Sequence, residues 1–213
     1  MDPLVEYYTR RAPEYESMWH RQDPARLGEQ AAMASALKAT CQARRVLEVA
    51  CGTGYWTQFA AAAAAEVIAL DLSPKMLAIA QSKNLARVTF VEGDAYNLAN
   101  LPGPFTTGLA NFWFSHVPKR RIKEFLDGFH AQLHSGARVF IADNVFVPGI
   151  GGELVSHPGM EDTFKLRQLA DGSSHEVLKN YYDAARLREI FQNRGGDLDI
   201  RIGRNFWWLS YVT

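Results

Sequence analysis

A short aliphatic run leads straight into a glycine turn in this 213-residue chain, and this stretch constrains the fold more than any other. The run from Val46 to Val49 predicts a strand that is buried on both faces. Gly52 and Gly54 then allow a tight turn and let the backbone approach a ligand without a Cβ in the way. A helix is expected from Thr53 into the small residues 60–65. Strand, turn and helix together predict a nucleotide-binding crossover, with the ligand at the start of the helix.

The spacing of the glycines argues against a dinucleotide ligand. A dinucleotide fold uses the pattern Gly-x-Gly-x-x-Gly, whose third glycine allows close contact between the helix and the strand. Here Thr57 occupies the third position and follows the bulky Trp56. This departure counts against NAD and FAD as ligands.

Composition and charge exclude several other classes of protein. The 47% of hydrophobic residues is ordinary for a globular protein, and the formal net charge of zero does not indicate a general binder of polyanions. No apolar run reaches the roughly 18 residues of a transmembrane helix, and the N-terminus lacks a signal-peptide pattern. Two cysteines are too few for a disulfide framework, and no Cys/His spacing indicates zinc. A cytoplasmic location is therefore expected.

Asp71 ends the second expected strand, residues 66–71. It lies 17 residues after Gly54, where nucleotide-binding folds place an acid that accepts hydrogen bonds from ribose hydroxyls. The alternative is a structural role, in which Asp71 puts a negative charge at the N-terminus of the helix opened by Ser73-Pro74. In that helix Met76 is expected either to form an apolar wall for an adenine or to pack in the core.

The third expected strand, residues 87–92, runs into Gly93-Asp94-Ala95. Asp94 is placed to accept a hydrogen bond from an adenine amino group, although an Asp after Gly also commonly forms a turn. A fourth strand at 106–112 leads into the aromatic segment Asn111–Pro118. An amphipathic helix with an apolar stripe over 122–133 and a fifth strand at 137–146 are expected next.

Taken in order, these motifs resemble those of the class I S-adenosylmethionine (SAM)-dependent methyltransferases. The stretch Glu48–Gly54 is similar to motif I of that family, acidic-x-Gly-x-Gly-x-Gly, with Ala50 in the first glycine position. Asp71 with Ser73-Pro74, and then Gly93-Asp94-Ala95, follow at the family spacing. The segment Asn111–Pro118 is similar to motif IV of the family members that methylate small molecules. The close resemblance covers residues 44–147.

The resemblance implies an α/β, Rossmann-like, doubly wound sheet of seven strands in the order 3-2-1-4-5-7-6, with strand 7 antiparallel. It also implies that the cofactor lies across the carboxyl ends of strands 1, 2 and 4. The chain is expected to form a single domain over 1–213, with a helical lid in residues 1–42. A β-hairpin insert after strand 5, within residues 148–180, is expected to shape the acceptor site.

The cofactor implied by the resemblance is SAM, with S-adenosylhomocysteine (SAH) as the product. Motif I should frame the methionine end, Asp71 the ribose, and Asp94 with Ala95 the adenine. The expected cofactor-binding residues are Glu48, Ala50, Gly52, Gly54, Trp56, Asp71, Leu72, Met76, Asp94, Ala95 and Asn111. No metal is expected, because an isolated pair such as Asp143-Asn144 more often belongs to a turn or a pocket than to a magnesium site.

Aromatic side chains are dense in the N-terminal arm, residues 3–20. Tyr7, Tyr8, Tyr15 and Trp19 either anchor this arm to the core or form a lid that excludes water from a reaction. A second helix is expected over residues 23–41. The expected acceptor-binding residues are Tyr15, Trp19, Trp113, Asn144, Arg167 and Trp207.

His116 and Tyr7 are the candidate catalytic residues. An imidazole near its unperturbed pKa of about 6.5 can take a proton at neutral pH, and the apolar neighbours at 112–114 would keep it neutral. His116 also precedes a helix, so the alternative is that it only hydrogen-bonds the turn.

The sequence therefore favours a SAM-dependent methyltransferase that acts on an N or O atom of a small aromatic or heterocyclic metabolite. One alternative is a nucleic-acid or protein methyltransferase, because residues 111–114 superficially resemble an Asn-Pro-Pro-aromatic motif without its prolines. Another is a non-catalytic SAM-binding subunit. The expected partner is a small-molecule acceptor, with no nucleic acid and no membrane, and the expected assembly is a monomer or a homodimer.

Overall fold

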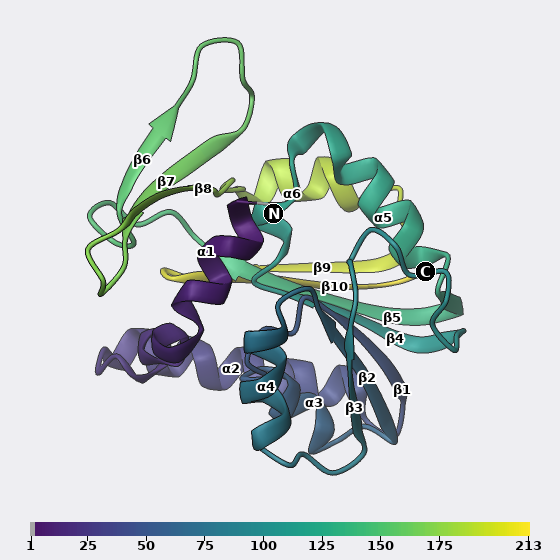
Figure 1. Ribbon diagram of the computed structural model, residues 1–213. Coiled ribbons are helices and arrows are strands. Elements are labelled where there is room, and N and C mark those ends of the chain that lie inside the picture. Colours follow the sequence, from purple (N-terminus) through teal and green to yellow (C-terminus); the bar gives the residue numbers. More distant parts are fainter. Residues whose placement is uncertain (1–2) are drawn as a thin grey trace.

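The computed structural model describes residues 3–213, and a seven-stranded sheet runs through its centre (Figure 1). In spatial order the strands are β3 (Val88–Glu92), β2 (Glu66–Asp71), β1 (Arg45–Val49), β4 (Phe105–Asn111), β5 (Leu133–Asn144), β10 (Phe206–Val212) and β9 (Gly196–Ile202). The first five strands are parallel, and β10 pairs antiparallel with both β5 and β9. This is the order 3-2-1-4-5-7-6 with an antiparallel strand 7, so the expected fold class is confirmed.

Helices cover both faces of the sheet. The helices α2 (Pro24–Cys41), α3 (Thr57–Ala61) and α4 (Pro74–Ser82) lie on one face, and α5 (Ile122–His130) and α6 (Ala184–Phe191) lie on the other (Figure 1). Central strands that are covered on both faces need continuous apolar runs rather than alternation. The buried side chains of β1 and β2 meet this need, with Val46, Leu47, Val67 and Leu70 at most 1% exposed.

Three expected boundaries were wrong. The helix after the glycine turn begins at Thr57 and ends at Ala61, because residues 52 and 54 have positive φ angles that no α-helix contains. Likewise α5 ends at His130, and the strand β5 already begins at Leu133, where the apolar stripe had suggested helix.

The N-terminal arm consists of the helix α1 (Pro3–Arg11) and a 3-10 helix, Ala12–His20. Trp19 at the end of this arm is 1% exposed and stacks on Tyr55 with the ring centres 5.0 Å apart. It also packs edge-on against Trp56 and Phe112. Trp19 therefore anchors the arm to the core, which is the structural alternative expected for the arm's aromatic residues.

The insert after β5 contains the expected hairpin, to which one further strand pairs to make a small three-stranded sheet. Its strands are β6 (Glu153–Ser156), β7 (Thr163–Gln168) and β8 (Ser174–Leu178), in the order β6-β7-β8. This small sheet projects from the main sheet next to α1 (Figure 1). The four residues of β6 are too few to show an alternating pattern, which explains why the sequence did not indicate this strand.

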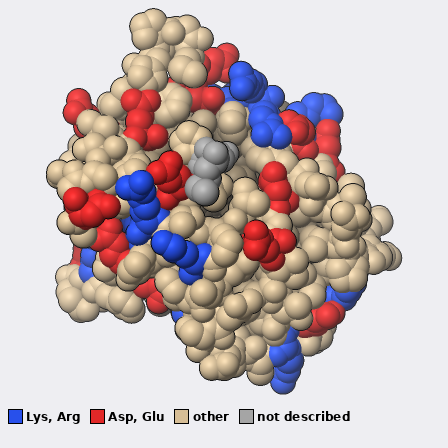
Figure 2. Space-filling view, in the orientation of Figure 1, with Lys and Arg blue, Asp and Glu red and all other residues tan. Residues whose placement is uncertain are grey.

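Charges of both signs are interspersed on the face drawn in Figure 2. Within residues 3–213 no helix is long and apolar enough to cross a membrane. The two cysteines, Cys41 and Cys51, are both buried as free thiols.

Candidate active site

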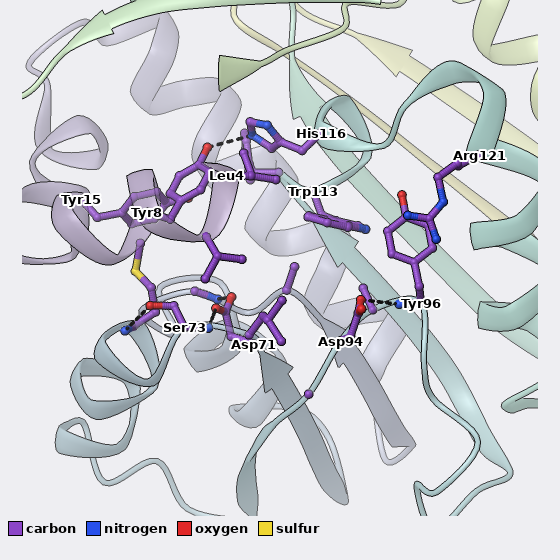
Figure 3. Close-up of a pocket in the computed structure, with 18 residues that line it drawn as sticks. Leu4, Tyr8, Tyr15, Asp71, Ser73, Asp94, Tyr96, Trp113, His116 and Arg121 are labelled. Atoms are coloured by element: carbon purple, nitrogen blue, oxygen red, sulfur yellow. Dashed lines mark hydrogen bonds between the residues drawn. The ribbon is translucent and has the colours of Figure 1, made fainter. Parts of the chain in front are cut away.

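A cavity opens at the carboxyl ends of β1, β2 and β4, and α1 covers it with Leu4, Val5 and Tyr8 (Figure 3). Its volume is about 860 Å³ when the open mouth is included. Doubly wound sheets bind ligands at this position, where the strand order reverses. The expected residues that line the cavity are Ala50, Gly52, Asp71, Leu72, Met76, Asp94, Ala95, Tyr15, Trp113 and His116.

Asp71 joins the glycine turn to the end of β2. Its Oδ2 accepts a hydrogen bond from the backbone N–H of Gly52 at 2.8 Å, and its Oδ1 accepts one from the N–H of Ser73 at 2.9 Å. Burial raises the pKa of Asp71, and these backbone donors oppose that shift. Each carboxylate oxygen keeps a further lone pair for a ligand. Asp71 thus holds the turn in place and also lines the cavity.

Bare backbone forms the floor of the cavity at the glycine turn. Gly52 has a φ of +56°, and a Cβ added there would meet nothing closer than the Tyr15 ring at 3.9 Å. Ala50, in the first glycine position of the motif, holds a φ of +51° at a cost of about 1 kcal/mol. Gly54 has a different role, because a Cβ there would lie 3.2 Å from the Cβ of Ala80 in α4. It permits close helix packing and does not line the cavity.

Tyr96 and Arg121 line the end of the cavity next to Asp94 and Ala95 (Figure 3). The Oδ1 of Asp94 accepts a hydrogen bond from the N–H of Tyr96 at 2.9 Å. The guanidinium carbon of Arg121 lies 3.6 Å from the Tyr96 ring centre. Sequence reasoning missed both residues, because Tyr96 lies in the turn after β3 and Arg121 ends a short 3-10 helix before α5, and only the fold brings them together.

Glu48 and Asn111 lie beneath the cavity and do not line it. Glu48 is 1% exposed, and its Oε1 accepts a hydrogen bond from the Asn111 Nδ2 at 3.1 Å. The Glu48 Oε2 is buried without a hydrogen-bond partner. Burial raises the pKa of Glu48 to about 7, and the nearby Thr57 hydroxyl and the Asn111 amide only partly oppose this.

We expect Glu48→Gln to remove a pH dependence of stability. The raised pKa means that folded Glu48 binds a proton which the unfolded chain has already released between about pH 4.5 and pH 7. The free energy of unfolding of the wild type should therefore fall across this range. The difference in free energy of unfolding, variant minus wild type, should therefore rise by about 2–3 kcal/mol between pH 5 and pH 8. Urea titrations of both proteins at the two pH values measure this difference, and a constant difference would contradict the shifted pKa.

Tyr8 and His116 meet inside the cavity (Figure 3). The Tyr8 hydroxyl lies 2.8 Å from the His116 Nε2, and the His116 Nδ1 lies 2.6 Å from the backbone oxygen of Leu178. A carbonyl oxygen can only accept, so the Nδ1 donates to it and the Nε2 of the neutral ring accepts from Tyr8. Burial raises the pKa of Tyr8 to about 12.

His116 is 4% exposed, and burial together with nearby Lys179 lowers its pKa well below the usual value. The expectation of a nearly unperturbed imidazole was therefore wrong. The ring is neutral at pH 7 and its Nε2 lone pair is directed at Tyr8, because the Nδ1 proton is held by the carbonyl at the end of β8.

A buried ion pair supports the loop that carries His116. The Nζ of Lys179 donates to the Asp143 Oδ1 at 2.8 Å and to the Ser115 Oγ at 2.6 Å. The Asp143 Oδ2 in turn accepts from the backbone N–H of Ser115 at 2.9 Å. Burial would raise the pKa of Asp143, but Lys179 and these hydrogen bonds outweigh it and hold the pKa below its usual value.

Tyr7, expected as a catalytic residue, does not line the cavity. It faces the insert instead, is 1% exposed and packs with Leu169 and Val177. Its neighbour Tyr8 takes the place in the cavity, because adjacent residues of a helix lie on different faces. The pair Leu4 and Tyr8 has the i, i+4 spacing of a shared helix face, and this was the signal available in the sequence.

Several other expected site residues lie elsewhere. Trp207 is fully buried in the core against Phe114, and Trp56 stacks on Phe112. Asn144 and Arg167 line a second cavity between the N-terminal arm and the insert. The residues that do not line the main cavity are Glu48, Gly54, Trp56, Asn111, Tyr7, Trp19, Asn144, Arg167 and Trp207. Phe112, from the aromatic segment after β4, lines the main cavity as well.

The residues of the main cavity fit SAM. The bare backbone of the glycine turn leaves room for a closely bound ligand, and Asp71 has free lone pairs beside it. Met76, which is 2% exposed, and Ala95 supply apolar walls. Among residues 3–213 no cluster of three or more His, Cys, Asp or Glu side chains is placed to hold a metal ion.

Comparison with known proteins agrees with this fit. The family model described as a methyltransferase domain matches residues 46–136. An uncharacterised methyltransferase from Oceanobacillus iheyensis is 29% identical over 166 residues, which is 78% of this chain and 75% of that protein. The biotin biosynthesis bifunctional protein BioHC from Cellvibrio japonicus is 32% identical over 109 residues. That match covers 50% of this chain but only 21% of the longer relative.

A solved structure resembles nearly the whole chain. The complex of DhpI with SAH has a TM-score of 0.77 and 26% sequence identity, and the match covers 98% of this chain and 94% of DhpI. A complex of DhpI with SAM and HEP gives the same TM-score at 25% identity. With the strand order, the glycine turn and the strand-end acids in agreement, these matches support a class I SAM-dependent methyltransferase.

Proposed function

We propose that this protein transfers the methyl group of SAM to an N or O atom of a small aromatic or heterocyclic molecule. The observation that carries the proposal is the Tyr8–His116 pair inside the main cavity, 2.8 Å apart and covered by α1. Aromatic side chains that suit a flat acceptor surround this pair. They are Tyr15, Tyr96, Phe112 and Trp113.

Bound SAM supplies a methyl group that is already activated on a positively charged sulfur, so the tasks of the protein are alignment and exclusion of water. Leu4 and Val5 of α1 close the cavity from above. A contact between the Thr9 and Ser73 hydroxyls, 2.8 Å apart, fastens α1 to the start of α4. This contact makes α1 a lid that sequesters the acceptor.

Tyr8 and His116 provide a path for the acceptor's proton. As the acceptor attacks, its proton passes to the Tyr8 oxygen while the Tyr8 proton moves to the Nε2 of His116. The imidazolium that forms keeps its Nδ1 proton on the Leu178 carbonyl oxygen. His116 is neutral beforehand because burial lowers its pKa. It can therefore act as the base at neutral pH.

Asp71→Ala should weaken SAM binding by about 1.5–3 kcal/mol, because ribose hydroxyls would lose a charged acceptor. The substitution also frees the N–H groups of Gly52 and Ser73, so the glycine turn contributes to the loss. Titration calorimetry with SAM and SAH measures the change. Asp94→Ala makes the corresponding change at the adenine end for comparison. Unchanged affinity for SAM in Asp71→Ala would contradict the assignment of Asp71 to the ribose.

We also propose that no metal takes part and that the insert, residues 148–180, shapes the acceptor site of a single-domain enzyme. The mixed charges of Figure 2 favour a small acceptor over a nucleic acid, which would need a local basic surface. The two buried free thiols agree with a cytoplasmic location. A monomer or a homodimer is the proposed assembly.

Incubation of the protein with a cell extract and deuteromethyl-SAM tests the function. Mass spectrometry should find a small metabolite that gains a trideuteromethyl group, and His116→Ala should form it far more slowly. Label on RNA or on protein alone would support the nucleic-acid or protein alternative. SAM binding without any labelled product would support a non-catalytic subunit.

A further inference from the structure

A second cavity, lined by four arginines, lies between the N-terminal arm and the insert. Arg11, Arg21, Arg26 and Arg167 line it together with polar side chains that include Asn144 and Tyr181. Among the residues that the structure describes, no carboxylate lines this cavity. Within residues 3–213 none of the four guanidinium groups has an Asp or Glu oxygen within 4 Å. The cavity therefore gathers positive charge without a counterion from the described part of the chain.

Two of these arginines converge on one neutral atom. The Nη1 of Arg11 donates to the Tyr7 hydroxyl oxygen at 2.9 Å, and the Nη1 of Arg167 donates to the same oxygen at 3.3 Å. Like charges held this close repel each other, more strongly where water is excluded. A hydroxyl does not neutralise either charge, so the arrangement is incomplete without an anion.

Buried donors without partners point to the same conclusion. The Nε of Arg167 and the Nε of Arg26 are both buried, and neither has a hydrogen-bond acceptor. Arg26 is 7% exposed and lies 4.5 Å from the Phe206 ring centre, which fixes its orientation. Buried donors are normally satisfied, and a guanidinium matches the two oxygens of a carboxylate or phosphoryl group.

The arginine cavity adjoins the site of methyl transfer. Tyr15 lines the main cavity, and the guanidinium carbon of Arg11 lies 5.4 Å from its ring centre. The Tyr8 and Tyr15 rings are themselves 5.9 Å apart. Glu14 lines a neighbouring opening with Arg11 and Arg167 but pairs with neither of them. One small molecule can therefore place its nucleophile at Tyr8 and an anionic group at the arginines.

We propose that the methyl acceptor carries an oxyanion, a carboxylate or a phosphoryl group, that Arg11 and Arg167 bind. This inference rests on the proposed methyl transfer to a small molecule. It adds that the acceptor is recognised by charge, at a site separate from the SAM residues. Arg26 and Arg21 complete the positive surround of the anionic group.

Calorimetry on the SAH-loaded protein tests the anion site directly. Inorganic phosphate and benzoate, titrated separately, represent the phosphoryl and the carboxylate source. The wild type should bind at least one of them with a Kd on the order of 1 mM or tighter. Arg11→Gln and Arg167→Gln should each weaken that binding about tenfold or more, while SAH affinity stays unchanged. Arg188, an exposed residue of α6, supplies the matched control, and Arg188→Gln should bind as the wild type does.

The outcomes separate this proposal from the methyltransferase function. If neither anion binds the wild type, or if both arginine variants bind like the control, the anion site is overturned. A labelled acceptor without any anionic group, found in the deuteromethyl-SAM experiment, also overturns it but leaves methyl transfer intact. Saturable anion binding that depends on Arg11 and Arg167, with no labelled metabolite, supports the anion site and counts against the proposed function.

Discussion

His116→Ala should lower kcat about 10²–10⁴-fold and leave SAM affinity nearly unchanged. The expected loss is large because His116 is the acceptor for the Tyr8 hydroxyl, and Tyr8 lines the cavity beside it. SAM affinity should persist because the strand-end acids Asp71 and Asp94 and the glycine turn lie on other elements. Stopped-time assays with the identified acceptor measure kcat, and calorimetry measures the affinity for SAM.

The pH–rate profile provides a second readout of the same role. Burial and Lys179 lower the pKa of His116, so the acidic limb of the wild-type profile should lie below pH 6.5. Above that limb the base is neutral and the rate should be level. Loss of His116 should abolish the limb, since no titrating base remains.

Tyr8→Phe is the matched control for the proton path. It removes only the hydroxyl that lies 2.8 Å from the His116 Nε2 and keeps the ring packed on Tyr15. If the two residues act as one relay, Tyr8→Phe and the double variant should be nearly as slow as His116→Ala. Normal turnover in His116→Ala would show that the histidine only hydrogen-bonds the turn. Loss of SAM binding in His116→Ala would show that His116 has a structural role.

The second large effect is on stability. Lys179→Met should lower the free energy of unfolding by about 3–5 kcal/mol, because it leaves the carboxylate of Asp143 buried without a counterion. Asp143 is fully buried, and the side chain of Lys179 is 3% exposed. The same change removes the hydrogen bond from Lys179 to the Ser115 Oγ and so weakens the support of the loop that carries His116, although the Asn180 N–H still donates to the Ser115 backbone oxygen.

Lys165→Met is the matched control within the insert. Lys165 is also buried, but its Nζ donates only to the backbone oxygens of Ile150 and Gly152 and leaves no charge behind when it is removed. Its expected cost is therefore smaller. The double variant Asp143→Asn/Lys179→Met should recover part of the loss, since neither side chain is then charged.

The pH dependence of the Lys179→Met deficit checks its cause. In the wild type, Lys179 holds the pKa of Asp143 below its usual value. The pair therefore stabilises the fold at pH values above the usual pKa of an Asp, and this stabilisation is lost as the pH falls. In the variant, protonation of the orphaned Asp143 removes the buried charge. The deficit measured by denaturant titration should thus be larger at pH 7 than at pH 4. A deficit that is equal at both pH values, or equal to that of Lys165→Met, would contradict the charge argument.

The sequence by itself determined the parallel half of the fold and the edge of it at which we propose that the cofactor binds. The signals are local. They are apolar runs such as 46–49, a glycine turn directly after one of them, and carboxylates at the ends of the next two strands: Asp71 ends β2, and Asp94 follows Glu92 at the end of β3. Parallel strands bring their carboxyl ends to one edge of a sheet. Local patterns were therefore sufficient to bring Ala50, Gly52, Asp71 and Asp94 to one cavity.

Only the tertiary structure decided what lies opposite the cofactor residues. Tyr8 rather than Tyr7 faces His116, because the rotation of α1 about its axis is set by packing against the insert. The approach of Arg11 to Arg167 and of Lys179 to Asp143 joins segments far apart in the chain. No periodicity within one segment records such contacts, since they depend on how separate elements dock. The sequence therefore located the proposed cofactor edge, and the docking of the N-terminal arm and the insert decided the residues of the proposed acceptor side.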